Sequence, residues 1–150
     1  MTTREISLTI NGEATRAGVP VRQNLVDFLR GLGLTGSHVG CEHGVCGACT
    51  LEVDGAMVRG CLMLAAQADG ALVTTVEGWA DSGRGDALRA AFIRHNALQC
   101  GYCTPGMLAS ALEYIEAGGS ADRSAIRAHI SGNYCRCTGY QAVVEAIADV

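Results

Sequence analysis

Eight cysteines are the residues of this chain best suited to chemistry, and they form two groups of four. The first group has the spacing Cys41-x4-Cys46-x2-Cys49-x11-Cys61. This spacing, with three cysteines in one tight loop and a fourth on a neighbouring segment, is one that holds two sulfide-bridged irons. Three glycines lie in the same loop: Gly40, Gly44 and Gly47. Because a loop that curls around a cluster needs positive φ angles and N–H groups directed at sulfur, the first group predicts a 2Fe-2S centre.

The second group has a different arrangement, Cys100-x2-Cys103 followed after 31 intervening residues by Cys135-x-Cys137. Two predicted helices fill the interval, and an antiparallel helical pair would bring the two short cysteine loops together. Both loops directly precede helix N-termini, whose partial positive charge favours thiolate. The pattern predicts a second metal centre, for which structural zinc and an iron–sulfur cluster are both open alternatives.

Composition limits the class of protein. A length of 150 residues suits one ordinary domain or two small ones. A net charge of −4 and an apolar fraction of 49% exclude a basic nucleic-acid binder and a chain that is disordered by composition. The sequence has no apolar run of the roughly 18 residues that a membrane span needs and no signal-peptide pattern. We therefore expect a cytoplasmic location, where reducing conditions favour metal binding over four disulfides.

The N-terminal half predicts an α+β arrangement. Residues 6–10 alternate apolar and polar side chains and meet Asn11-Gly12, a strong hairpin signal. A helix is predicted over 24–32, with an apolar face formed by Leu25, Phe28, Leu29 and Leu32. Further strands are predicted at 50–53, 56–59 and 72–76, the first two joined by a turn at Asp54-Gly55.

The C-terminal half predicts helices only. Residues 78–85 lose periodicity and become small and polar, which is typical of a linker. Helices are predicted over 86–95, 105–117, 124–130 and 140–150. Thr104 is expected to be an N-cap with Pro105 as the first helical residue, and Thr138 is expected to cap the last helix.

Three motifs, in this order, resemble those of the small iron–sulfur subunit of the molybdenum hydroxylases. They are GCEHGVCGAC (40–49) with Cys61, QCGYCTPG (99–106) and NYCRCTGY (133–140). The family includes xanthine dehydrogenase, aldehyde oxidoreductase and carbon monoxide dehydrogenase. The resemblance implies an α+β fold: a ferredoxin-like β-grasp domain over 1–77, a linker over 78–85 and an all-helical four-helix domain over 86–150.

The resemblance also implies a role and a set of site residues. The outer 2Fe-2S cluster would be held by Cys41, Cys46, Cys49 and Cys61, and the inner one by Cys100, Cys103, Cys135 and Cys137. Gln99 and Cys137 would approach the molybdopterin of a large partner subunit. The chain would pass electrons from that site to FAD on a medium subunit or to another acceptor, with no catalytic residue of its own. A free-standing two-cluster ferredoxin and one cluster with a zinc site are the alternatives.

A few residues lie outside this pattern. Glu42 and His43 stand where relatives such as xanthine dehydrogenase carry small residues or glycine, and two interpretations are open. They either form a solvated surface or influence the outer cluster through charge and hydrogen bonding. Because eight thiolates complete two four-ligand sites, no histidine is expected to bind metal. Trp79, the only tryptophan, is expected to pack the two halves together.

Overall fold

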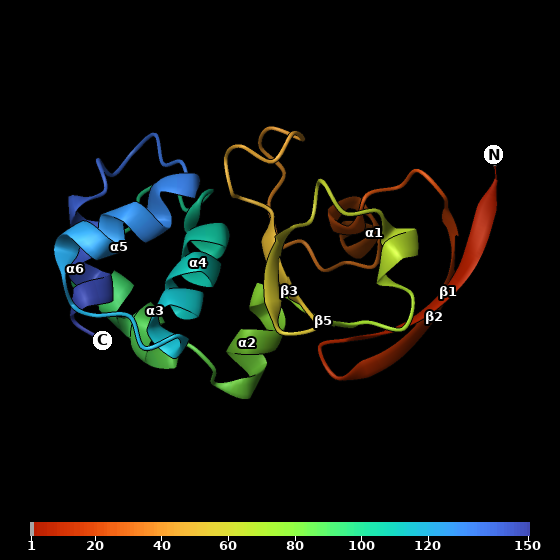
Figure 1. The fold of residues 1–150 in the computed structure, drawn as a ribbon, viewed down its shortest axis with the longest axis horizontal. Coiled ribbons are helices and arrows are strands. Elements are labelled where there is room, and N and C mark those ends of the chain that lie inside the picture. The colour runs from red at the N-terminus through yellow and green to blue at the C-terminus, as the bar shows by residue number, and fades with distance from the viewer. Residues whose placement is uncertain (1) are drawn as a thin grey trace.

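The computed structural model describes residues 2–150 and has two parts, a five-stranded sheet and a group of helices (Figure 1). The strands are β1 (Thr3–Ile10), β2 (Glu13–Pro20), β3 (Thr50–Val53), β4 (Ala56–Arg59) and β5 (Leu72–Thr74). The sheet has the order β2-β1-β5-β3-β4, in which only the β1–β5 pair is parallel. The α-helices are α1 (Leu25–Gly31), α2 (Val76–Ser82), α3 (Asp86–Arg94), α4 (Thr104–Glu116), α5 (Arg123–His129) and α6 (Gln141–Ala148). Short 3-10 turns occupy Ala65–Ala68 and Ile130–Gly132. Within residues 2–150, every helix is too short or too polar to cross a membrane.

Two tight hairpins build the sheet, as the sequence predicted. Asn11 and Gly12 both have positive φ angles, of 51° and 86°, and they join β1 to β2. Asp54 and Gly55 have φ angles of 50° and 81° and join β3 to β4 in the same manner. Two consecutive positive φ angles match the twist of paired strands, which is why these dipeptides were informative. The strand predicted at 72–76 is shorter and ends at Thr74.

Helix α1 covers one face of the sheet and completes the first core. Its N-cap is Asn24, whose side chain accepts a hydrogen bond of 2.8 Å from the Asp27 N–H. The apolar side chains of α1 and β1 are buried together: Ile6, Leu8, Ile10, Leu25, Phe28 and Leu29. The prediction for Leu32 was wrong, because α1 ends at Gly31 and the Leu32 side chain, at the C-cap, is 48% exposed.

Four helices, α3 to α6, enclose the second core. Its largest buried side chains include Leu88, Phe92, Met107, Ile126 and Val143. Two predicted caps were wrong. Helix α4 begins at Thr104 itself, with Cys103 in the cap position, and Tyr140 rather than Thr138 precedes α6.

The stretch predicted to be an irregular linker is largely helical. Helix α2 covers Val76–Ser82, and only the last residues before α3 form a turn. Trp79 of α2 is buried in the core of the helical half, where it packs with α3 and α4 side chains. The ribbon in Figure 1 shows α2 between the sheet and the helices.

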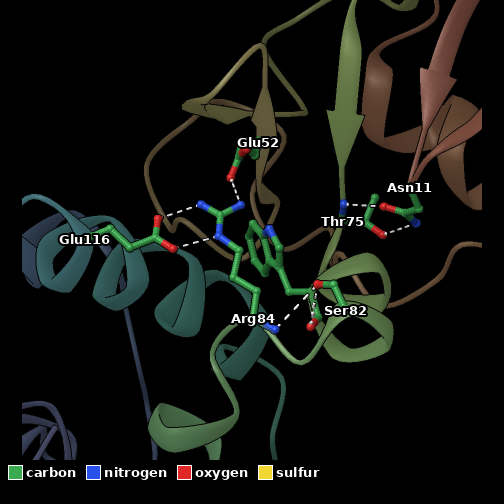
Figure 2. A network of polar contacts seen from close by, with 7 residues as sticks. Asn11, Glu52, Thr75, Ser82, Arg84 and Glu116 are labelled. Atoms are coloured by element: carbon green, nitrogen blue, oxygen red, sulfur yellow. Dashed lines mark hydrogen bonds and ion pairs between the residues drawn. The ribbon is translucent and has the colours of Figure 1, made fainter.

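Arg84, two residues after the end of α2, connects the two parts of the molecule. Its guanidinium donates two hydrogen bonds to Glu116 of α4, of 2.7 and 2.6 Å, and one of 2.6 Å to Glu52 of β3. Figure 2 shows the Arg84 side chain between these carboxylates. The Arg84 Cζ also lies over the Trp79 ring, 5.9 Å from its centroid. The guanidinium holds the pKa of Glu116 below its usual range. Bidentate charged pairs are among the stronger protein hydrogen bonds, so Arg84 stabilises the contact between the sheet and the helices.

We expect Arg84→Gln to lower the free energy of unfolding by about 1–3 kcal/mol, because Glu52 would lose its charged partner while its side chain remains 13% exposed. Denaturant unfolding followed by circular dichroism measures the effect. Arg123→Gln is the matched control, since it breaks a bidentate pair with Glu145 on the exposed surface. Equal losses in both variants would contradict the role given to Arg84.

Candidate metal centres

The loop between α1 and β3 carries Cys41, Cys46 and Cys49, and Cys61 follows β4. The loop turns through positive φ angles at Glu42 (58°), Gly44 (80°) and Gly47 (77°). Glycine adopts this conformation without strain and glutamate does not. Glu42 stands where relatives such as xanthine dehydrogenase resemble one another in carrying a small residue or glycine. The positive φ angle of Glu42 is thus a backbone conformation that glycine would adopt without strain.

Backbone N–H groups converge on the Cys41 sulfur. The Cys46 N–H lies 3.4 Å from Cys41 Sγ. The N–H groups of Cys46, His43 and Val45 lower the pKa of the Cys41 thiol to about 6. His43 adds a local contact, from its Nδ1 to the Cys41 carbonyl. A ring of N–H donors around a sulfur stabilises negative charge there, as an anion-binding backbone nest does.

The second group of cysteines comes together from two loops. Cys100 and Cys103 precede α4, while Cys135 and Cys137 lie between the 3-10 turn Ile130–Gly132 and α6. The Sγ atoms of Cys100 and Cys137 are 3.6 Å apart. Two thiolates on one tetrahedral metal, with metal–sulfur bonds of ~2.3 Å, lie about 3.8 Å apart. The structure thus brings together all four predicted residues of this group, with one pair at the separation that a shared metal requires.

One thiol in each group, that of Cys49 and that of Cys103, has a raised pKa because it is buried close to another thiol. Burial and the neighbouring Cys61 raise the pKa of Cys49 to about 11. Burial and the neighbouring Cys135 raise the pKa of Cys103 to about 12. Two negatively charged thiolates side by side in a buried site need a positive charge next to them, and a bound metal ion supplies that positive charge. The donor chemistry therefore fits a bound thiophilic metal such as iron or zinc.

Each thiol has a neighbouring thiol in its own group: Cys41 is close to Cys46, Cys49 to Cys61 and Cys103 to Cys135, and the Sγ atoms of Cys100 and Cys137 are 3.6 Å apart. Across residues 2–150, no three His, Cys, Asp or Glu side chains surround one point as ligands of a single metal ion do. Four thiolates around two irons place two sulfurs on each iron. The pairing therefore suits a two-iron cluster in each group.

Polar neighbours of the second group were not singled out by the sequence as sulfur contacts. Thr138 donates to Cys135 Sγ from its N–H (3.4 Å) and its hydroxyl (3.1 Å). Burial opposes the charged form of Cys135, but these hydrogen bonds prevail and lower its pKa. The Tyr102 N–H lies 3.5 Å from Cys100 Sγ. Thr138 is three residues after Cys135, a spacing typical of local side-chain hydrogen bonds, which is the signal that could have identified it.

Gln99, predicted to approach a pterin, makes a contact within this chain. Its Nε2 donates a hydrogen bond of 3.1 Å to the carbonyl of Cys137, which joins the two cysteine loops. Cys100 and Cys137 are exposed on this face, whereas Cys49 of the first group is buried. The second group therefore opens onto the surface of the isolated chain beside Gln99.

Comparison with known proteins identifies the family. A family model described as a 2Fe-2S iron-sulfur cluster binding domain matches residues 8–75, and a [2Fe-2S] binding domain model matches residues 75–148. The nicotine 6-hydroxylase small subunit of Paenarthrobacter nicotinovorans is 52% identical over 97% of this chain and 88% of its own length. The chain belongs to the family of small iron–sulfur subunits of the molybdenum hydroxylases. This iron–sulfur subunit therefore has two 2Fe-2S binding domains, and the second match favours iron–sulfur over zinc for the second group.

Solved structures of relatives have the same fold as this iron–sulfur subunit. Quinoline 2-oxidoreductase from Pseudomonas putida 86 matches with a TM-score of 0.91 and 48% identity, over 98% of this chain and 91% of that chain. Aldehyde oxidoreductase from Desulfovibrio gigas matches with a TM-score of 0.86 and 38% identity, over 97% of this chain and 16% of that chain. The α+β fold with a ferredoxin-like part and a helical part is confirmed.

If the second group of cysteines holds a 2Fe-2S cluster, we expect Thr138→Val to lower the reduction potential of that cluster, on the order of tens of millivolts. The hydroxyl hydrogen bond to Cys135 Sγ stabilises the more negative, reduced state, and valine keeps the shape of the side chain without that bond. Redox titration followed by EPR measures the shift. Thr138→Ser retains the hydroxyl and serves as the control. A potential unchanged in the valine variant would contradict the role of this hydrogen bond.

Proposed function

We propose that this chain is the electron-transfer subunit of a cytoplasmic molybdenum-dependent oxidoreductase. It would pass electrons one at a time between a molybdopterin site on a large subunit and FAD, or another acceptor, on a partner subunit. The outer cluster would be held by Cys41, Cys46, Cys49 and Cys61, and the inner cluster by Cys100, Cys103, Cys135 and Cys137. When bound, each 2Fe-2S cluster supplies a one-electron carrier.

The observation that carries this proposal is the contact between the two cysteine groups. The Tyr134 N–H, next to Cys135, donates a hydrogen bond of 2.9 Å to the carbonyl of Cys46. A residue adjacent to one group is therefore bonded directly to a member of the other. Two adjacent one-electron centres on a single chain suit the transfer of electrons between partners on opposite sides.

The exposure of the two cysteine groups supports an orientation for the proposed relay. Cys100 and Cys137 are exposed beside Gln99, and the exposed apolar side chains of Leu98 and Tyr134 lie close to them in sequence. A large subunit that covers this face would bury apolar surface and bring its cofactor to the inner sulfurs. The hydrogen bond from the Gln99 amide to the Cys137 carbonyl holds Gln99 beside the second cysteine group, which supports an approach of Gln99 to the pterin of a large subunit.

The loop of the outer group would face the electron acceptor. Glu42, His43 and Val45 are exposed on this loop, while Cys49 is buried beneath it. The N–H groups around Cys41 would hold the sulfurs of this cluster in place, and burial of Cys49 would exclude water from its inner side. Differences in exposure and hydrogen bonding between the two centres would set different potentials.

Purification through a tag on this chain from its native host tests the proposal. We expect about four irons per chain, two distinct 2Fe-2S signals in EPR of the reduced sample and a stoichiometric amount of molybdenum. Flavin in the same complex would identify FAD as the acceptor. A chain that elutes alone with two clusters would be a free-standing ferredoxin, and one with about two irons and a zinc would contradict the relay.

The assignment of ligands is tested by removing one thiol from each group. We expect Cys46→Ala to abolish one EPR signal and Cys103→Ala to abolish the other, because each cluster needs four thiolates. Iron content per chain and the two spectra are the measurements. Each variant serves as the control for the other, and loss of the same signal in both would contradict the division into two groups.

A further inference from the structure

The two cysteine groups meet where two glycines bring their backbones into contact. Gly47 lies in the first cysteine loop, which is the orange loop above β3 in Figure 1, and Gly106 lies in the first turn of α4. A Cβ atom on Gly106 would lie 2.0 Å from the Gly47 carbonyl oxygen and 3.0 Å from the Ala48 Cα. Both atoms belong to the backbone, so no side chain can move aside. Only glycine at position 106 allows this separation of the two segments.

The side chain of Asn133 stabilises this contact with hydrogen bonds to both segments. It is 3% exposed, and its Nδ2 donates to the carbonyl of Gly106 (2.9 Å) and, at 3.4 Å, to that of Gly47. Its Oδ1 accepts a hydrogen bond of 2.7 Å from the Ser110 hydroxyl of α4. Asn133 itself lies two residues before Cys135. One buried amide therefore joins the three segments that carry seven of the eight cysteines.

The Gly47 side of the junction is also fixed from the sheet. The Thr50 hydroxyl donates a hydrogen bond of 2.7 Å to the Gly47 carbonyl. Arg59 of β4 contacts the Thr50 hydroxyl and donates one of 2.8 Å to the carbonyl of Gly132. Because buried polar groups are costly to leave unpaired, separation of the two segments would be opposed by several hydrogen bonds at once.

We propose that Gly106 and Asn133 are positioning residues that set the distance between the two clusters. The inference rests on the proposed function, since it requires both clusters to be present. Gly106 sets how closely the two segments approach, and Asn133 holds them at that separation. Electron transfer slows steeply with distance, so a fixed spacing would keep the relay fast.

The first test is Gly106→Ala in the purified complex. Alanine is a good helix former, so the substitution does not weaken α4 itself. The added Cβ atom must, however, push the Gly47 backbone away. The magnetic interaction between the two reduced clusters falls with the cube of their separation, and pulsed EPR at low temperature measures it. We expect a weaker interaction, with the iron content and the g values of each singly reduced cluster unchanged.

Gly31→Ala is the matched control. Gly31 ends α1, and a Cβ there would have no atom within 4 Å. We expect this variant to retain the wild-type magnetic interaction. Arg84→Gln should also retain the wild-type magnetic interaction. This substitution breaks the ion pairs with Glu52 and Glu116 but leaves the contact between Gly47 and Gly106 intact.

Asn133→Leu tests the same contact between the two segments without adding an atom at position 106. Leucine nearly keeps the volume and removes all hydrogen bonds of the amide, so we expect a weaker or more broadly distributed magnetic interaction. The proposal is overturned if either variant, with four irons per chain, shows the wild-type interaction. A wild-type complex that lacks the second cluster would instead contradict the proposed function, so the two failures are distinguishable.

Discussion

Repulsion between crowded sulfurs is the constraint on which the rest of this structure depends. Burial and neighbouring thiols raise the pKa values of Cys49 and Cys103 well above that of a free cysteine. The fold must oppose this cost with fixed dipoles and with bound metal. The N–H groups around Cys41 and the Thr138 hydrogen bonds to Cys135 supply part of that compensation. The sheet and the helices serve largely to hold these dipoles in place.

Local chemistry explains which parts of the fold could be predicted from the sequence. Asn11-Gly12 and Asp54-Gly55 form turns because these residues tolerate consecutive positive φ angles, a preference that distant contacts do not change. Asn24 caps α1 for a similarly local reason. The cysteine spacings were informative because a small rigid cluster restricts how far apart its ligands can lie in a loop.

The features that could not be predicted depend on contacts between distant residues. Residues 76–82 are too short and too polar to show a helical period, yet Trp79 of α2 is buried in the helical core. Thr104 has the side chain of a good N-cap, but the geometry of the preceding cysteine loop places Cys103 in that position. Asn133 carries no local signal either, because its partners Gly47 and Gly106 are 86 and 27 residues away.

The exposure of Cys100 and Cys137 has a consequence for the lifetime of the subunit before assembly. Cysteine sulfurs at a surface are open to oxidants, whereas the buried Cys49 is shielded. A copy of the chain that no other subunit covers would therefore leave the sulfurs of Cys100 and Cys137 open to oxidation. In the proposed complex, a large subunit that covers this face would also shield these two sulfurs from oxidants.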